Sequence, residues 1–365
     1  MKKKLVGILL CVAVLGTMMT GCGSEKGKSQ DDAKETTESA ESGEASDPES
    51  YDFSQDKSFD ITAGGIQAAE DTVTLAMQKM ADEAKEKSGG TISITVSPAA
   101  QLGDATSQME AVSLGTQEMF VDAGSWLSTF VDDAQVTSMF FLFDSEEHYK
   151  KFLESDINAD MEQQLIDQQG IRVVANNWLR SPRSISCAKE ITSAEDLKGL
   201  KMRVPDIKSY MESATALGLG TAQVAWGETY LALQQGVVDS CESPLDSIYT
   251  MKFYEPTKQV TLTEHIRDNA AVYMNDSLYQ ELSDAQKQVL TEAARNAGIW
   301  YTDEVKKVSE EYQKKMESEG TNFYTPSEDA IKEMSEIVAK RAAELETEGV
   351  WKKGLFEEIK ALSDK

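Results

Sequence analysis

A stretch without proline runs from residue 283 to about residue 319, and it constrains the fold more than any other feature of the sequence. Its apolar residues keep a helical period, and it holds one interior glycine, Gly298. At about 1.5 Å per residue such a helix is about 50 Å long, whereas a lobe of ~150 residues has a radius of gyration of only about 15 Å. The pattern therefore predicts one helix that lies across two lobes. No strict heptad repeat persists, which argues against a coiled coil.

Strand-like and helix-like segments alternate along the rest of the folded part. Alternating apolar residues predict strands, and a helical apolar period predicts a helix between them. The expected strands are 59–61, 91–96, 118–121, 171–175 and 201–204, and the clearest helix is 70–87. Such alternation is typical of parallel sheets flanked by helices. Because about 300 residues are many for one core, we expect an α/β protein with two lobes.

The N-terminal segment predicts export and a lipid anchor. Lys2–Lys4 precede an apolar run, Leu5–Val14, that is too short to span a membrane. The small residues that end at Gly21, followed by Cys22, resemble the lipobox of bacterial lipoproteins, although Met19 stands where leucine is commoner. That resemblance implies a signal peptide over residues 1–21 and lipid attachment at Cys22, at the outer face of the cytoplasmic membrane. The alternative is an ordinary signal peptide with a chance cysteine.

An acidic segment, residues 22–57, follows the signal. From residue 23 onward it contains 11 acidic and 4 basic side chains and few apolar ones, so it predicts a disordered tether. The formal charge of the whole chain is −27, which argues against nucleic acid as a partner. An anionic ligand would therefore need a local group of arginines.

Motifs of the common catalytic classes are missing from the sequence. It has no Gly-x-Ser-x-Gly elbow, His-Glu-x-x-His motif, phosphate loop or Cys-x-x-Cys pair. Its 2 histidines, His148 and His265, are far apart, which argues against a nucleophilic triad or a His-rich metal site. We expect no enzyme, cofactor or metal, with a glycosidase-like carboxylate pair as the remaining enzymatic alternative. With Cys22 lipidated, Cys187 and Cys241 could form one disulfide.

Several short blocks follow one another between residues 85 and 255. They are Lys85–Gly90, Pro98–Asp104, Met139–His148, Trp178 with Arg183 five residues later, Glu195–Val204, Trp226–Asp239 and Phe253–Glu255. In this order they resemble the solute-binding component of tripartite ATP-independent periplasmic (TRAP) transporters. The block Glu195–Val204 is the strongest match.

The resemblance implies both a fold and a function. The fold would be a two-lobed, periplasmic-binding-protein-like α/β fold, with a ligand cleft between the lobes and the long helix spanning both. Lobe I would comprise 58–180 and 268–306, and lobe II 181–267 and 307–365. The protein would capture a small organic carboxylate, a sugar acid or a dicarboxylate, by hinge closure, and deliver it to membrane permease subunits. The alternatives are a lipoprotein of an ATP-driven importer and a protein associated with a sensor.

Arginines are the main candidates for binding a carboxylate. Arg203 ends a predicted strand just before Pro205, and open α/β sheets bind ligands at the carboxyl ends of their strands. A guanidinium offers a planar pair of N–H donors that matches a carboxylate, and the resemblance implies this role for Arg203. A surface ion pair is the alternative. Arg183, with Arg180 close by, could bind a second ligand oxygen or brace the strand beside Trp178.

Four further residues are candidates because of their positions in the resemblance. Trp226 stands where the family usually has phenylalanine, and it would form a flat apolar wall for the ligand or part of the core. Ser243 replaces the usual asparagine and offers a single hydroxyl. Glu242 could accept a hydroxyl proton from the ligand or support its loop, and Trp178 is a candidate through its spacing to Arg183. Weaker candidates in the other lobe are Asp104, Asp122 and His265.

Overall fold

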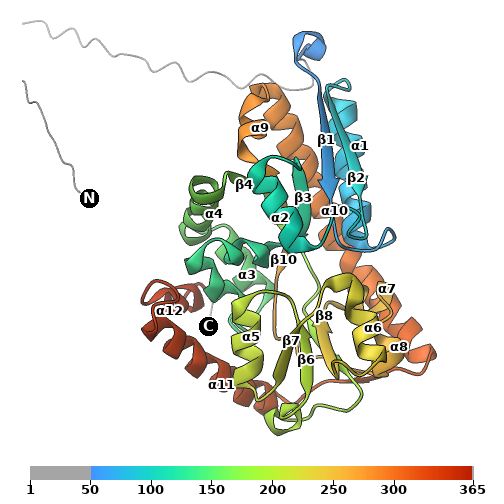
Figure 1. Ribbon diagram of the computed structural model, residues 1–365, viewed down its shortest axis with the longest axis vertical. Coiled ribbons are helices and arrows are strands. Elements are labelled where there is room, and N and C mark those ends of the chain that lie inside the picture. The colour runs from blue at the N-terminus through green and yellow to red at the C-terminus, as the bar shows by residue number, and fades with distance from the viewer. Residues whose placement is uncertain (1–50, 364–365) are drawn as a thin grey trace, which may run out of the picture. The chain divides into compact units, whose positions relative to one another are not determined.

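The computed structural model describes residues 51–363, whose strands form two mixed sheets (Figure 1). The first sheet has the strand order β2-β1-β3-β10-β4. Its members are β1 (Phe59–Gly64), β2 (Ile92–Ser97), β3 (Met119–Ala123), β4 (Ile171–Leu179) and β10 (Asn269–Asn275). β1 is parallel to β2 and β3, while β10 is antiparallel to β3 and β4. The chain therefore returns to this sheet after building most of the second one.

Side-chain caps fix the starts of the helices that accompany the first sheet. These helices are α1 (Thr72–Lys87), α2 (Ala105–Leu114), α3 (Glu146–Leu153), α4 (Asp156–Gln169) and α9 (Asp276–Glu281), with the 3-10 turns η2 (Phe53–Gln55), η3 (Gly124–Thr129) and η4 (Asp132–Ser138). Asp71, Asp104, Ser145 and Ser155 each accept a hydrogen bond from a backbone N–H of the first helical turn. These bonds satisfy donors that a helix start otherwise leaves free.

The second sheet has the order β11-β9-β5-β8-β6-β7. Its strands are β5 (Ser184–Cys187), β6 (Lys201–Val204), β7 (Gly220–Gln223), β8 (Ser240–Ser243), β9 (Gln259–Thr261) and β11 (Asn322–Tyr324). Its helices are α5 (Lys208–Ala216), α6 (Thr229–Gln234), α7 (Leu245–Thr250), α8 (Tyr254–Thr257), α11 (Glu328–Thr347) and α12 (Leu355–Lys360), with η5 (Ala194–Leu197) and η6 (Trp226–Glu228). β6 is parallel to β7 and β8, whereas β5 is antiparallel to β8 and β9.

The two-lobed α/β architecture is confirmed, and each lobe is built around one of these sheets. The exact lobe limits stay a prediction. The segment 307–365 was assigned to lobe II, yet α12 also packs against η4, and His148 of α3 lies 2.9 Å from the carbonyl oxygen of Ile359. Among the residues that the structure describes, no helix is both long and apolar enough to cross a membrane.

The expected long helix is α10 (Asp284–Ser318), and it is continuous over 35 residues. Ser283 and Gln286 cap its start reciprocally, and Glu319 ends it. α10 packs against α1 and β4 of the first lobe and against α7 of the second (Figure 1). The prediction of one helix that spans both lobes is therefore confirmed.

Gly298 allows β4 to approach α10 closely. A Cβ at this position would lie 2.3 Å from Cδ1 of Trp178 and 2.6 Å from Oδ1 of Asn177. Trp178 cannot easily move away, because its side chain is fully buried and its Nε1 donates a hydrogen bond to the carbonyl of Ala294 at 2.8 Å. The glycine is thus required by packing, although it weakens the helix locally.

We expect Gly298→Ala to lower the free energy of unfolding by up to about 2 kcal/mol, because overpacking costs about 1–3 kcal/mol and the helix-propensity gain offsets only ~1 kcal/mol of it. Urea denaturation of the ligand-free protein measures the change. Gly227→Ala is the control, since a Cβ there would meet nothing within 4 Å. A stabilised Gly298→Ala protein would contradict the close approach.

Candidate ligand-binding site

A small cavity lies where the carboxyl ends of strands from both lobes meet. Its volume is about 30 Å³. The first lobe contributes residues that follow β1 and β3, and the second contributes Arg203 of β6 and residues that follow β6 and β7. The lining residues are Ile66, Gln67, Asp122, Ala123, Ser125, Trp126, Arg180, Arg183, Arg203, Pro205, Ile207, Tyr210 and Trp226. The position agrees with the rule that ligands bind outside the carboxyl ends of parallel strands.

Arg203 is a buried cation without a carboxylate partner. It is 5% exposed, and β6 holds it in register with Ala222 of β7 and Cys241 of β8. Its Nε donates to the carbonyl of Val224 at 2.9 Å, and its guanidinium lies 5.3 Å from the ring centroid of Trp226. No carboxylate in the described part of the chain forms an ion pair with it. Burial accordingly lowers the pKa of Arg203 to about 10, although the nearby Glu242 opposes the shift.

Arg183, in contrast, is already paired with acidic groups. Its Nη2 donates to Oε1 of Glu242 at 2.9 Å, its Nε bonds the other carboxylate oxygen, and its Nη1 lies 3.4 Å from Asp268. Nε2 of His265 is 3.6 Å from the same glutamate. Burial alone would raise the pKa of Glu242, but the charge of Arg183 and the nearby His265 hold it down to about 2. Burial also lowers the pKa of His265.

Arg180 lies between two acidic side chains, Asp122, which lines the cavity, and Asp268, which does not. Its Nη1 is 3.9 Å from carboxylate oxygens of both Asp122 and Asp268. Asp122 also accepts hydrogen bonds from Nε1 of Trp126 at 2.9 Å and from Nε2 of Gln67 at 3.2 Å. Burial raises the pKa of Asp268, against the lowering effect of Arg180 and Arg183. The first-lobe wall is therefore rich in hydrogen-bond acceptors.

A wider opening of about 520 Å³ adjoins the cavity and shares Arg203, Trp126 and Trp226 with it. The opening lies between the start of α2 and the segment 223–228. A ligand can therefore reach Arg203 from this side.

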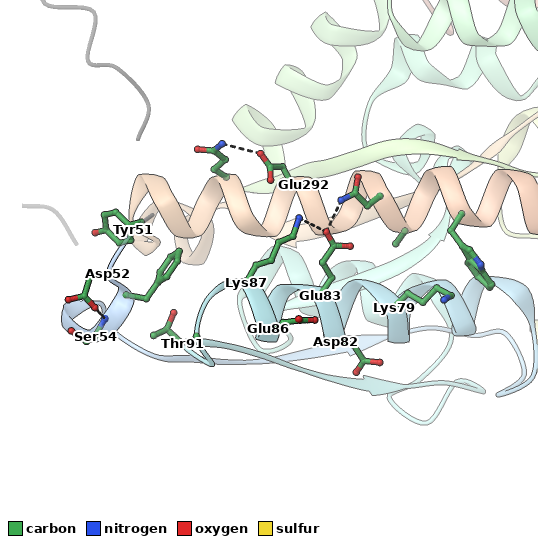
Figure 2. A pocket seen from close by; sticks show the side chains of 16 residues that line it. Tyr51, Asp52, Ser54, Lys79, Asp82, Glu83, Glu86, Lys87, Thr91 and Glu292 are labelled. Atoms are coloured by element: carbon green, nitrogen blue, oxygen red, sulfur yellow. Dashed lines mark hydrogen bonds and ion pairs between the residues drawn. The ribbon is translucent and has the colours of Figure 1, made fainter. Parts of the chain in front are cut away.

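A larger hollow, about 1690 Å³, lies elsewhere, between residues 51–54, α1 and α10 (Figure 2). Several of its polar and charged groups are already engaged by neighbouring side chains. Lys87 pairs with Glu83 at 2.8 Å, Asn296 also donates to Glu83, and Lys79 lies over the ring of Trp300. We therefore assign the ligand site to the cavity at Arg203.

Comparison with known proteins identifies the family. The family model described as "Bacterial extracellular solute-binding protein, family 7" matches residues 63–348. The chain belongs to this family. One relative is the sialic acid-binding periplasmic protein SiaP of Vibrio cholerae, which is 30% identical over 277 residues, 76% of this chain and 86% of that protein.

Solved structures of TRAP periplasmic solute-binding proteins show the same fold. The protein from Roseobacter denitrificans, with bound L-galactonate, has a TM-score of 0.74 and 26% identity, and the match covers 80% of this chain and 99% of that one. The protein from Fusobacterium nucleatum, with bound sn-glycerol-3-phosphate, has a TM-score of 0.77 and 27% identity, covering 83% and 96%. These relatives are named as solute-binding proteins and not as enzymes.

The structure brings some of the predicted site residues together. Arg203, Arg183, Arg180 and Trp226 line the cavity of this family 7 protein. Glu242 and Ser243 lie next to each other on β8, fully buried, and do not line it. Glu242 binds Arg183, a partner that neither interpretation of that residue named. The weaker candidates lie at different places: Asp122 lines the cavity, Asp104 lines the wider opening, and His265 lies near Glu242.

Trp178 is not brought to the cavity. Its ring packs 5.9 Å from that of Tyr301 in the core of the first lobe, against α10. Lipid attachment at Cys22 lies outside the described residues. Cys187 and Cys241 are both free buried thiols, so the possible disulfide is not formed in this structure.

Sequence reasoning missed Trp126, Tyr210 and Gln67, which also line the cavity. Trp126 and Gln67 follow β3 and β1, so a search for polar and aromatic residues just after each expected strand could have found them. Tyr210 lies on α5, where its ring faces the guanidinium of Arg183 at 5.7 Å. No local pattern distinguishes it from an ordinary core tyrosine.

Two buried carboxyl groups from different lobes meet near this site. Asp71, the cap of α1, accepts hydrogen bonds from Thr250 at 3.0 Å and from Ser247 at 3.4 Å, both on α7. Asp246, beside Ser247, is 1% exposed, and neither of its carboxyl oxygens has a hydrogen-bond partner in the described chain. Burial and then the neighbouring Asp71 raise the pKa of Asp246 to about 7, while Arg180 opposes the shift.

Asp246→Asn should remove a pH-dependent loss of stability. The folded protein keeps a proton on Asp246 that the unfolded chain releases above its ordinary pKa of 3.8, so wild-type stability falls as pH rises from about 4 to about 7. The asparagine variant should gain stability relative to wild type over this window. Melting temperatures between pH 4 and pH 8 measure it, with the exposed Asp160→Asn as control. Parallel profiles for wild type and Asp246→Asn would show that Asp246 is not protonated in the folded state.

Proposed function

We propose that this protein captures a small organic carboxylate, a sugar acid or a dicarboxylate, between its lobes and delivers it to a TRAP importer. The single observation that carries the proposal is Arg203, a buried guanidinium at the carboxyl end of β6 with no carboxylate partner in the described chain. A two-point contact with a ligand carboxylate would supply that partner. Trp226, over which the guanidinium lies, would offer an apolar face to the carbon skeleton of the ligand.

The ligands of the relatives support this assignment. The Vibrio protein is named for sialic acid, and the two solved structures contain L-galactonate and sn-glycerol-3-phosphate. All three ligands are small, hydroxylated anions. Membership of family 7 also favours a secondary importer over an ATP-driven one.

We infer that capture moves the two lobes. The inner cavity of about 30 Å³ is far smaller than the roughly 300–1,000 Å³ of typical small-molecule sites, so a ligand seated against Arg180 and Arg183 as well as Arg203 needs more room than it offers. Its walls come from both lobes, so separation of the lobes would open it and a bound acid would draw them together. Ligand binding would then shift an open–closed equilibrium, and the closed form would be recognised by the permease subunits.

A thermal-shift screen of organic and sugar acids tests the proposal. An acid that binds only the native state raises the melting temperature, by an amount that grows with its concentration relative to the Kd. Matched neutral compounds, such as the alcohol or lactone of each acid, serve as controls. A protein that responds to the neutral compounds and to none of the acids would overturn the proposed function.

We further propose that Cys22 carries a lipid that tethers the protein to the outer face of the membrane. The sequence around Gly21 and Cys22 supports this proposal. Cys22→Ala should leave the precursor uncleaved or shed the protein into the medium. Mass spectrometry of the mature N-terminus checks it, and an unmodified mature N-terminus in the wild type would refute it.

A further inference from the structure

The charges around the cavity bear on how many carboxylates a ligand can carry. Three buried arginines, Arg180, Arg183 and Arg203, face three buried acids, which are Asp122, Glu242 and Asp268. Arg183 is bound by Glu242 and Asp268, and Arg180 lies between Asp122 and Asp268. These two arginines already face more acidic than basic groups, so neither has positive charge to spare.

The wider opening adds no further cation. Its charged lining residues are Arg203 itself and the acids Asp104, Asp206 and Glu228. Along the path from solvent to the inner cavity, as the described residues form it, Arg203 is thus the one cation without a carboxylate partner, although Nε of Arg180 also has no hydrogen-bond partner there. A carboxylate at the far end of the same ligand would be buried without a counter-charge, which is strongly unfavourable.

The remaining polar groups of the cavity suit hydroxyls. Oε1 of Gln67 is buried and accepts no hydrogen bond from the described residues, and Asp122 beside it is an acceptor as well. The rings of Trp126 and Trp226 flank these groups with apolar surface. Acceptors and aromatic faces match the O–H and C–H groups of a polyhydroxylated chain, whereas a second carboxylate would be repelled by Asp122.

We propose that the captured acid carries a single carboxylate, bound by Arg203, and a neutral remainder whose hydroxyls donate to Gln67 and Asp122. The inference rests on the proposed function and narrows it from organic acids in general to monocarboxylic sugar acids. Dicarboxylates of the same length are excluded by charge and not by size.

Pairs of ligands that differ in one group test this. Galactonate and gluconate are compared by calorimetry at pH 7.5 with galactarate and glucarate, in which the terminal CH2OH of each is replaced by a second carboxylate. The same comparison is made for every other aldonate found in the thermal-shift screen. We expect each diacid to bind at least tenfold more weakly than its monoacid. A diacid that binds as tightly as its monoacid, or more tightly, would overturn the inference while leaving the proposed function intact.

Asp122→Asn provides a second measurement on the same pairs. It removes one negative charge from the first-lobe wall of the cavity, so the diacid should gain affinity relative to the monoacid. The ratio of their Kd values should fall severalfold. The exposed Asp160→Asn should leave the ratio unchanged. If Asp122→Asn does not fold, the comparison of monoacids and diacids on the wild-type protein still tests the inference. If no acid of either kind binds the wild type, the proposed function fails, and the inference fails with it.

Discussion

Arg203→Ala should bind the cognate acid about 30- to 5,000-fold more weakly than the wild type, because truncating one member of a buried charge pair costs about 2–5 kcal/mol. The ligand carboxylate would lose the one cation of the site that has no acidic partner in the described chain. Calorimetry with the best acid from the screen measures the loss. Arg203→Lys keeps the charge but loses the planar pair of donors, so it should also bind much more weakly.

The ligand-free protein should tolerate Arg203→Ala. Removal of Arg203 leaves no buried carboxylate without a partner, because none pairs with it among the described residues. Melting curves of the apo variant provide the control. Binding within about threefold of wild type, or a best ligand without a carboxylate, would show that the site is wrongly assigned even though the fold is right.

Arg183→Ala should instead destabilise the fold, by about 3–5 kcal/mol, because it leaves a buried charge unpaired. Glu242 is fully buried and would lose its ion pair, with His265 at 3.6 Å and the more distant guanidinium of Arg203 as the remaining groups near its carboxylate. Urea denaturation of the ligand-free protein measures the change. Truncation of the exposed Lys198, which pairs with Glu195 at the surface, is the control and should have little effect.

A double variant separates pairing from packing. When both charges are replaced by apolar groups of similar volume, as in Arg183→Met with Glu242→Leu, much of the lost stability should return, because no lone charge remains buried. If Arg183→Ala instead unfolds at the urea concentration of wild type and loses only ligand affinity, Arg183 contacts the ligand directly and is not mainly held by Glu242.

The long helix and the alternating strands could be predicted because their signals are local. A run without proline and with a helical apolar period needs no distant partner to be recognised, and α10 begins at Asp284 and ends at Ser318, as expected. The position of Arg203 near the end of a strand could be predicted because the strand pattern, the following proline and the family block agree there. Elements whose formation depends on neighbouring residues along the chain could therefore be predicted from the sequence.

The partners of each charged side chain could not be predicted. Arg183 and Glu242 are 59 residues apart and meet only because β5 pairs with β8, where Ile185 faces Glu242. The face of β4 on which Trp178 lies could not be predicted either. β4 pairs with β10 through irregular register between Ala270 and Tyr273, and each such shift changes which face a residue occupies. Simple alternation along β4 therefore does not tell whether Trp178 faces the cavity or the core.

The acidic rim of the opening has a consequence for the speed of capture. Asp104, Asp206 and Glu228 surround the way to Arg203 on a chain whose formal charge is −27. An approaching anion is repelled at long range and attracted only at the end of its path, the reverse of the electrostatic steering that accelerates many associations. Dissolved salt screens the distant charges more than the buried contact. The association rate of the acid should therefore increase with ionic strength, so that capture is fastest in salty surroundings.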